Sequence, residues 1–357
     1  MLVRSFVYCG NNQYIQAFSH YPKKTNMDKI IAVVVSRNRH ALLVECIEAL
    51  RRQTLKPHTI LVVNNGSSDY TTVWLDKQED LVHLYQEDKG SAGGYSAGIE
   101  WAYKHHYTWV WSMDDVSYPK ADALEQLMAH ASGPLALLNS AVVNKVDKKS
   151  FVWKIKNYIQ IEEVKEATIE GVCHPFNGSL IHRALVERAG LPQSDLYYWG
   201  EGSEYYYRLT KQFKIPLITV TKSIQYHPPQ QFNIREEWDY MKSWKMYFYV
   251  RNRYRVLQTK YSNRVVAFIL YIGFIIAFGC IALTSQRRDK LRKMSFALWP
   301  MKDALFNQFT ATEETIQLRM SQRYRRFAFA RITHVVKRWI VQLFVPHYAE
   351  DSGTVIS

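Results

Sequence analysis

The chain has 357 residues, of which 47% are hydrophobic and 14% aromatic, a composition that excludes an intrinsically disordered protein. The formal net charge of +14 suits an anionic partner such as nucleic acid, acidic lipid or a phosphorylated substrate. Four scattered cysteines without CxxC spacing indicate a reducing compartment and argue against a zinc site.

The N-terminal stretch lacks the uninterrupted apolar core of a secretory signal. Met27 immediately precedes the first convincing strand. We therefore expect residues 1–28 to be an N-terminal extension outside the native fold.

Strand and helix patterns alternate from residue 30 onwards. Residues 30–36, "IIAVVVS", form a continuous β-branched run, which is typical of a strand buried on both faces. A helical pattern follows over 40–54, and strand patterns return at 59–65 and 82–86. The glycine-rich stretch "GSAGGYSAG" at 90–98 is expected to be a loop that runs into a helix, and it could let the backbone approach a phosphate.

The next strand is expected at residues 107–115, and it ends in Asp114 and Asp115. Pro119 is then expected to open a helix. The pattern is weaker beyond residue 135, although 215–229 again read as a strand. Alternating strands and helices predict an open, parallel α/β sheet, in which ligands bind beyond the carboxyl ends of the strands.

Residues 265–284 are twenty in a row without a charge, which is long enough for a membrane helix. Basic residues flank both ends, which fits a helix that enters one leaflet between anionic headgroups. A buried core helix is the alternative. Aromatic and arginine residues also alternate over 244–257, and we expect this segment to dock to an anionic membrane.

Several polar residues have both a functional and a structural interpretation. Asp114 and Asp115 could share a divalent cation or could form a solvated turn. His227, at a strand end, could be a metal ligand, a general base or a structural histidine. The stretch "YYWGEGSEYYYRL" at 197–209 is either the start of an amphipathic helix or a pocket that holds an acid against a ring-shaped ligand.

Taken in order, the motifs over residues 29–235 resemble those of family 2 inverting glycosyltransferases, closest to bacterial galactofuranosyltransferases and rhamnosyltransferases. The motifs that carry the resemblance are "VVVSRNR", "VVNNGSSD", "GSAGGYSAGI", "WVWSMDDVSYP", "FNGSLIHRALVERAGLP" and "WGEGSEYYYRL". The resemblance implies an α/β GT-A fold, which is a Rossmann-like, open and mostly parallel sheet flanked by helices. Residues 236–357 would then form a basic, helical, membrane-associating C-terminal region.

The resemblance also implies a nucleotide-sugar donor, a divalent metal (Mn²⁺ or Mg²⁺) and direct displacement with inversion. A UDP-sugar is favoured, with UDP-galactofuranose expected first and dTDP-rhamnose second. The donor residues implied are Ser36, Arg37 and Asn38 in the nucleotide pocket, Asn64 at the base or ribose, Gly93 and Gly94 beside the donor, and Asp114. The metal ligands implied are Asp114, Asp115 and His227.

Catalysis is assigned by the same resemblance to the acids of residues 197–209. Glu201 is expected to be the general base, and Glu204 to position the acceptor or share that role. Trp199 and Tyr198 would stack against the acceptor sugar. Arg208 would face the donor diphosphate or hold a carboxylate.

Two positions depart from the family pattern. Val116 stands where many relatives have a third acid of the metal motif, and Gly202 stands at the usual second acid of the base motif. The alternative is therefore a catalytically degenerate, transferase-like binding or assembly protein.

The acceptor implied is a glycan or lipid-linked glycan of a bacterial surface polysaccharide such as O-antigen, built at the cytoplasmic face of the inner membrane. The expected partners include an anionic membrane surface and no nucleic acid, and an oligomer is left open.

Overall fold

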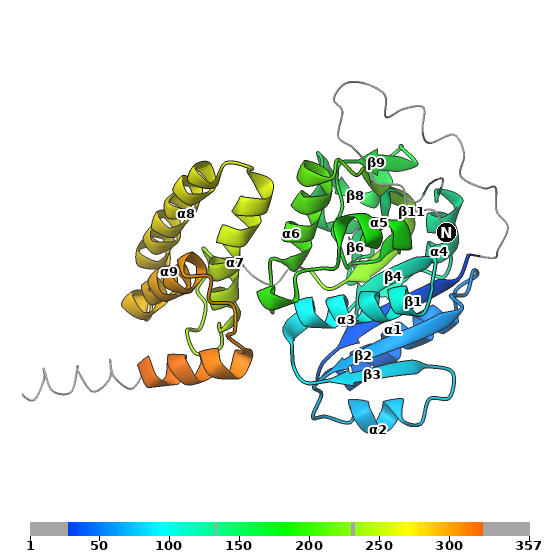
Figure 1. Ribbon diagram of the computed structural model, residues 1–357, viewed down its shortest axis with the longest axis horizontal. Helices are drawn as coiled ribbons and strands as arrows, with labels where there is room; N and C mark the ends of the chain where they lie inside the picture. The colour runs from blue at the N-terminus through cyan, green and yellow to red at the C-terminus, as the bar shows by residue number, and fades with distance from the viewer. Residues whose placement is uncertain (1–27, 132, 134, 230–232, 324–357) are drawn as a thin grey trace, which may run out of the picture.

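The computed structural model describes residues 28–131, 133, 135–229 and 233–323. Nearly all of the expected N-terminal extension and the end of the C-terminal region lie outside these residues. Figure 1 shows a sheet flanked by helices beside a bundle of helices.

Four parallel strands form one half of the sheet, in the order β3-β2-β1-β4. They are β1 (Ile30–Ser36), β2 (Thr59–Asn65), β3 (Val82–Gln86) and β4 (Trp109–Asp114). Alternate residues of β1 pack into hydrophobic clusters on opposite faces of the sheet, so the strand is buried on both sides as its sequence predicts.

The other half of the sheet is mixed. β10 (Ser179–His182) is antiparallel to both β4 and β6 (Leu137–Asn144), and β11 (Leu217–His227) runs parallel to β6. The remaining strands lie at the margins: β5 (Tyr118–Pro119), β7 (Ser150–Ile155), β8 (Tyr158–Gln160) and β9 (Thr168–Glu170). The sheet is therefore mixed and mostly parallel, as in the GT-A fold.

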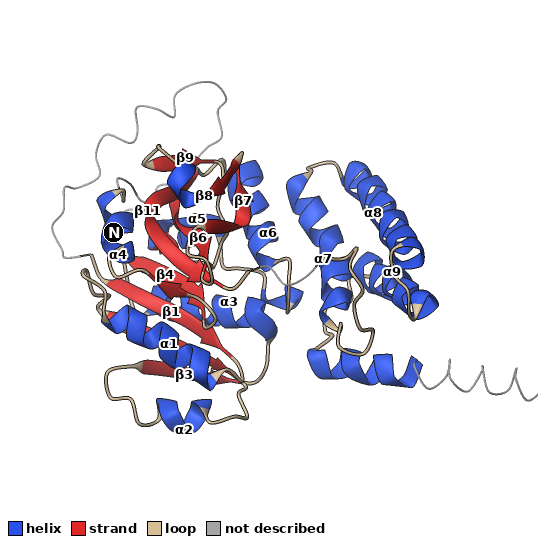
Figure 2. Ribbon diagram, turned by 180° about the vertical axis from the view of Figure 1, so that it is seen from behind, coloured by secondary structure: helices blue, strands red, loops and turns tan. Residues whose placement is uncertain are grey.

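Helices cover both faces of this sheet (Figure 2). They are α1 (His40–Arg51), α2 (Thr71–Leu75), α3 (Gly90–Lys104), α4 (Ala123–Ala129), α5 (Arg183–Ala189) and α6 (Glu201–Tyr207). A π-helical turn over Arg208–Gln212 extends α6, and short 3₁₀ turns lie at Ile161–Glu163 and Ser194–Leu196.

The glycine-rich stretch is helical, so the expected loop is wrong. α3 begins at Gly90, and its later glycines pack against β1. A Cβ at Gly94 would lie 2.4 Å from Val35 Cγ1, and a Cβ at Gly98 would lie 2.4 Å from Val33 Cγ1. These glycines therefore let a helix approach the sheet closely.

The helix expected to begin at Pro119 begins four residues later. Pro119 lies in β5, where it pairs with Gln225 of β11, and α4 starts at Ala123. Proline is tolerated in a short edge strand because its missing N–H need not join the ladder.

The C-terminal region is helical, as predicted from its sequence. It contains α7 (Lys245–Lys260), α8 (Arg264–Thr284), α9 (Lys290–Leu305) and a further helix over residues 313–323. The first three helices pack on one another around an aromatic cluster, and α7 contacts α6 of the sheet domain.

α7 contributes buried polar groups that hold the turn before α6. Arg251 donates to the carbonyl of Leu196, and Asn252 donates to the carbonyls of Leu196, Tyr198 and Trp199. Arg251 is fully buried. The expectation that the arginines of this segment face a membrane is therefore wrong for Arg251, because its charge is used inside the protein.

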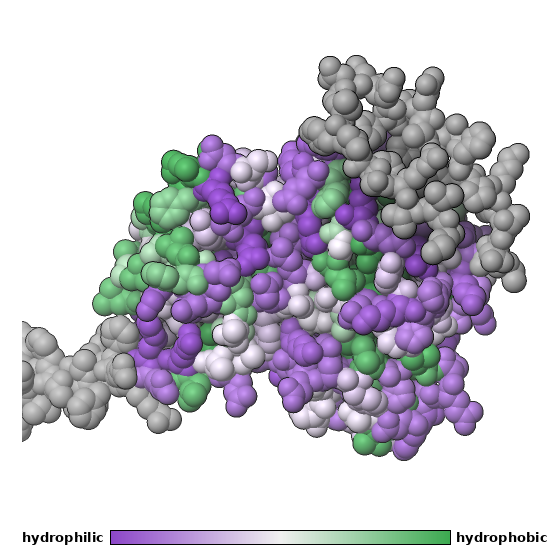
Figure 3. Space-filling view, viewed as in Figure 1, coloured by the Kyte–Doolittle hydropathy of each residue, from purple (hydrophilic) through white to green (hydrophobic). Residues whose placement is uncertain are grey.

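α8 is buried along one stripe only. Its buried residues are Ala267, Tyr271, Ile275, Phe278 and Ala282. Large apolar residues on the rest of its surface are exposed, including Val265, Ile269 and Ile276, each more than 60% exposed. Figure 3 shows an apolar surface over this part of the molecule. α8 is the one helix among the described residues that is long and apolar enough to cross a membrane, and it does not fit a core helix buried on all sides.

Candidate active site

The sheet topology brings the polar motifs to one edge. Ser36 pairs with Asn64 at the carboxyl ends of β1 and β2, and Asp114 lies beside Val35 at the end of β4. Continuous apolar strands end in polar residues here because this edge faces the loops. The expectation that these motifs meet is confirmed.

Asp114 and His227 form a pair at this edge. His227 Nε2 lies 3.4 Å from Asp114 Oδ2, and the ring of Trp153 packs against the imidazole with centroids 5.0 Å apart. Burial opposes ionisation of both groups, but their mutual hydrogen bond and attraction lower the pKa of Asp114 and raise that of His227. Asp114 Oδ1 is buried and has no hydrogen-bond partner among the described residues.

Asp115 has a different set of partners. Its carboxylate accepts hydrogen bonds from Ser36 Oγ (2.8 Å) and from Arg39 (2.9 Å). Burial raises the pKa of Asp115 to about 6, with the Asp114 charge adding to the shift and Arg39 opposing it. The positive charge that these adjacent acids require therefore comes partly from Arg39, a residue to which the sequence reasoning gave no role.

The predicted metal set of Asp114, Asp115 and His227 is not assembled as three ligands. Within the described part of the chain, no group of three His, Cys, Asp or Glu side chains is placed to hold a metal. Asp114 Oδ1 and His227 nevertheless offer oxygen and nitrogen ligands. Two protein ligands suit a Mg²⁺ or Mn²⁺ ion that completes its shell with substrate phosphates and water.

Glu201 lies at the start of α6 with its carboxylate only partly satisfied. Ser91 Oγ donates to Glu201 Oε1 over 2.7 Å, whereas Oε2 is buried and has no partner among the described residues. Burial raises the pKa of Glu201, and the Ser91 hydrogen bond partly opposes that shift. A carboxylate with a raised pKa and one free oxygen has the chemistry of a general base.

Glu201 and the two aspartates surround one buried tyrosine. Burial raises the pKa of Tyr95, and the charges of Asp114, Glu201 and Asp115 raise it further. Because such effects weaken with distance, all three acids lie in the region around Tyr95.

Glu204 is held within the protein. It is 1% exposed, and its oxygens accept hydrogen bonds from Arg208 (2.9 Å) and from Thr259 of α7 (3.2 Å). Burial raises the pKa of Glu204, and the Arg208 charge opposes the shift. Arg208 also donates to the carbonyls of Ala189 and Leu191. Of the two roles expected for Arg208, these contacts correspond to holding a carboxylate and not to facing a diphosphate, and Glu204 offers no free oxygen to an acceptor.

The residues expected in a nucleotide pocket mostly hydrogen-bond to the protein itself. Ser36 is directed to Asp115, and Asn38 accepts hydrogen bonds from the backbone of Ser68 and Asp69. Asn64 donates to Thr72 and accepts from the backbone of Ser67.

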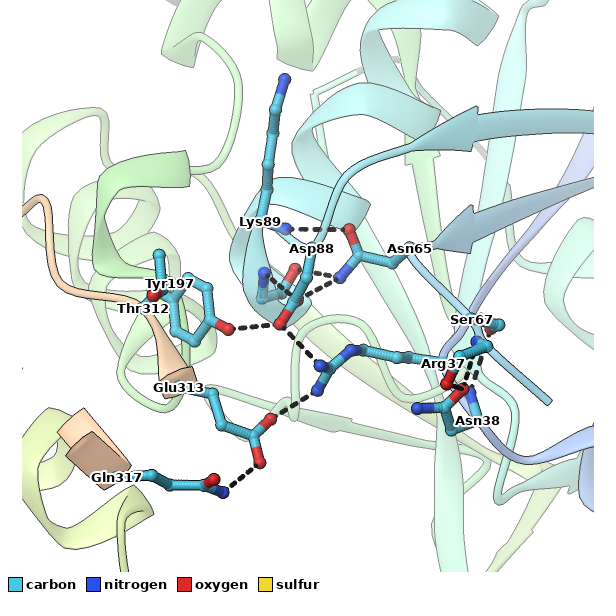
Figure 4. Close-up of polar contacts among 12 residues, drawn as sticks. Arg37, Asn38, Asn65, Ser67, Asp88, Lys89, Tyr197, Thr312, Glu313 and Gln317 are labelled. Atoms are coloured by element: carbon cyan, nitrogen blue, oxygen red, sulfur yellow. Dashed lines mark hydrogen bonds and ion pairs between the residues drawn. The ribbon is translucent and has the colours of Figure 1, made fainter. Parts of the chain in front are cut away.

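Arg37 differs from these three residues because its guanidinium, 37% exposed, binds two carboxylates, those of Asp88 and Glu313. Figure 4 shows Arg37 between these two acids, with Tyr197 hydrogen-bonded to Asp88.

Gly93 and Gly94, expected beside the donor, are buried in α3. A Cβ at Gly93 would clash with Lys89, and one at Gly94 with Val35. Their role in this structure is packing.

Tyr198 and Trp199 lie partly buried against the C-terminal helices. Tyr198 packs on Trp244, and Trp199 packs edge-on against Tyr249 of α7. Trp199 has a positive φ of 52°, so this turn holds a conformation that non-glycine residues seldom adopt. The three carbonyls bound by Asn252 explain how α7 maintains it.

The sequence reasoning also missed several residues of the site. Asp88 precedes the glycine-rich stretch and Ser91 lies within it, and the helical start of α3 brings both to the site. His174 lies against Trp153, and burial lowers its pKa to about 4, with the His227 charge adding to the effect. Asp88 could have been identified from its place two residues before Gly90, whereas nothing in the sequence marks His174 as a site residue.

Residues 31–189 match the Glycosyl transferase family 2 model. Galactofuranosyltransferase GlfT1 of Mycobacterium tuberculosis (strain ATCC 25618 / H37Rv) is 27% identical over 215 residues, which cover 56% of this chain and 70% of that protein. GlfT1 of Mycolicibacterium smegmatis is 26% identical over 220 residues, covering 57% and 72%.

Two solved structures also resemble the chain. GalNAc-T7 with UDP, GalNAc and Mn²⁺ has 17% identity and a TM-score of 0.45, over 63% of this chain and 51% of that one. S. aureus TarS has 12% identity and a TM-score of 0.46, over 80% and 44%. The chain thus spans about half the length of these two proteins.

Proposed function

We propose that this chain, whose residues 31–189 match the Glycosyl transferase family 2 model, is a family 2 glycosyltransferase that transfers galactofuranose from UDP-galactofuranose to a glycan or lipid-linked glycan, with inversion. The observation that carries the proposal is the Glu201 carboxylate, buried with one oxygen free beside the Asp114–His227 pair. The similarity to two GlfT1 galactofuranosyltransferases supports the choice of donor.

In the proposed reaction, Glu201 Oε2 accepts the proton of an acceptor hydroxyl while that oxygen attacks the anomeric carbon of the donor. The bond between the anomeric carbon and the β-phosphate oxygen breaks in the same displacement, and the nucleoside diphosphate leaves with the bonding electrons. Ser91 orients the carboxylate through Oε1 and leaves Oε2 directed to the acceptor. Attack on the face opposite the leaving group inverts the anomeric centre.

The leaving diphosphate requires positive charge, and Arg37, which follows β1, is the side chain proposed to supply it. His227, at the end of β11, is proposed to act as a neutral imidazole, because a protonated one cannot bind a metal. A divalent cation held by Asp114 and His227 would stabilise the charge that develops on the diphosphate. Arg39 keeps Asp115 in place behind this site, while Tyr198 and Trp199 are proposed to contact the acceptor sugar.

We further propose that α8 brings the enzyme to the cytoplasmic face of a bacterial inner membrane. Its exposed apolar surface is joined by basic residues at its first position, Arg264, and just beyond its last, Arg287 and Arg288. Such a helix can lie in the interface with its apolar face in the acyl chains and its basic residues at anionic headgroups. A lipid-linked glycan would then meet the active site from the same membrane.

Donor turnover tests the function directly. Purified full-length protein is incubated with UDP-galactofuranose, UDP-galactose, UDP-glucose or dTDP-rhamnose, with and without Mn²⁺, using bacterial membrane glycolipid as acceptor. We expect Mn²⁺-dependent release of UDP from UDP-galactofuranose, which Glu201→Gln removes. Release from dTDP-rhamnose instead would make the protein a rhamnosyltransferase, and UDP binding without turnover of any donor would indicate a binding protein.

A further inference from the structure

The helix over residues 313–323 reaches the donor side of the sheet domain through its first residue. The carboxylate of Glu313 forms an ion pair with Arg37, which lies 276 residues earlier in the sequence. Figure 4 shows Glu313 approaching Arg37 from the side opposite Asn65 and Lys89. The C-terminal region therefore contacts a residue assigned to the donor.

The two carboxylates that bind Arg37 are held in different ways. Asp88 is fixed within the sheet domain, where it accepts hydrogen bonds from Gly90 N (2.9 Å), Asn65 Nδ2 (3.3 Å) and the Tyr197 hydroxyl. Among the described residues, the Glu313 carboxylate has one other hydrogen-bond partner, Gln317 on its own helix, at 2.8 Å. Glu313 can therefore leave Arg37 and keep a hydrogen bond, whereas Asp88 would lose its place in the domain.

The charges around Arg37 do not accommodate a third anion. One guanidinium between two carboxylates already leaves a net negative charge, and a diphosphate beside them would be repelled by both acids. Arg37 Nε is buried and has no partner among the described residues, so the guanidinium retains a donor for another acceptor. A diphosphate therefore binds Arg37 most favourably if one of the two carboxylates withdraws. Glu313 is the carboxylate that can withdraw and keep a hydrogen bond.

We propose that Glu313 competes with the diphosphate of the donor for Arg37, so that donor binding displaces the Glu313 side chain and Glu313 sets the donor affinity. This inference rests on the proposed function, because it takes Arg37 to contact the donor diphosphate.

The test compares ligand affinities by calorimetry in full-length protein at low salt. The ligands are UDP, which has the diphosphate, and uridine, which lacks it. The variants are Glu313→Gln and its neighbour Glu314→Gln, an exposed acid on the same helix that serves as the control. We expect Glu313→Gln to bind UDP roughly fivefold more tightly than the unmodified protein, the ratio that corresponds to loss of one partly exposed ion pair. Uridine affinity should be unchanged, and Glu314→Gln should match the unmodified protein. Equal or weaker UDP binding by Glu313→Gln overturns the competition.

Arg37→Ala separates this inference from the function on which it rests. If Arg37→Ala weakens UDP binding and Glu313→Gln does not tighten it, the competition is wrong and the donor site stands. If UDP binds independently of Arg37, the competition is wrong and the proposed function stands; if UDP does not bind at all, both proposals fail.

Discussion

Ser91, near the start of α3, and Glu201, at the start of α6, are 110 residues apart in the sequence, and Ser91 Oγ donates a hydrogen bond to Glu201 Oε1 over 2.7 Å. The hydrogen bond fixes one carboxylate oxygen and leaves Oε2 buried without a partner among the described residues. A free oxygen on an oriented, desolvated carboxylate is what proton abstraction needs. Glu204, three residues on, has both oxygens engaged.

Replacing Glu201 with Gln should remove catalysis while keeping the fold. The amide retains the shape and the contact with Ser91 but cannot accept the acceptor proton, so we expect kcat to fall by roughly 10²- to 10⁴-fold. UDP affinity should be unchanged. Because burial raises the pKa of Glu201 in the folded state, its ionised form reduces stability at neutral pH, and thermal unfolding of Glu201→Gln should occur at the same or a higher temperature. Full activity in this variant would exclude Glu201 as the base.

The pH profile should have an acidic limb above the ordinary glutamate range. Glu201 acts only when ionised, so activity falls as the pH falls through its pKa, which burial places above 4.5. The measurement is kcat/KM for transfer between pH 4 and 8. A rate that does not change across the acidic part of this range would count against a raised pKa at the base.

Ser91→Ala should move this limb to higher pH. The Ser91 hydrogen bond stabilises the charged form of Glu201, so its loss raises the pKa further. Ser194→Ala, at an exposed serine, is the control and should leave the profile unchanged. A uniform loss of rate at all pH values, without displacement of the limb, would mean that Ser91 only positions the carboxylate.

Gly98→Ala should destabilise the sheet domain. The added Cβ would lie 2.4 Å from Val33 Cγ1 and 3.0 Å from Val63 Cγ2, in a buried contact between α3 and the sheet. We expect a loss of roughly 1–3 kcal/mol in the free energy of unfolding. Gly273→Ala on α8, where a Cβ would meet nothing within 4 Å, should be neutral or slightly stabilising. Chemical denaturation of both variants checks the difference.

Ile276→Asp should weaken binding to anionic vesicles. Ile276 lies on the exposed side of α8, and a charge there opposes entry into the acyl chains. Ile159→Asp places the same charge on an exposed isoleucine of β8 in the sheet domain and should bind vesicles like the unmodified protein. Sedimentation with phosphatidylglycerol vesicles measures both, and equal binding by the two variants would remove α8 from the proposed membrane surface.

The core strands and the residues at their ends could be predicted from the sequence. A continuous β-branched run such as 30–36 predicts a strand buried on both faces, and this prediction does not depend on knowing which strands lie beside it. Asp114 ends such a run, and the resemblance to family 2 supplied the candidate roles of Glu201 and His227. Local pattern failed at Gly90 and Pro119, since the packing of α3 on β1 and the pairing of β5 with β11 overrode their usual preferences.

The sequence by itself therefore determined the α/β class, the apolar segment at 265–284 and the positions of the acids at the ends of strands. Only the tertiary structure decided which distant charges neutralise one another: Arg39 with Asp115, and Glu313 with Arg37 across 276 residues. The physical reason is that strand and helix periodicity depend on neighbours within a few residues. An ion pair depends on the distance between two side chains, which the packing of the whole chain sets.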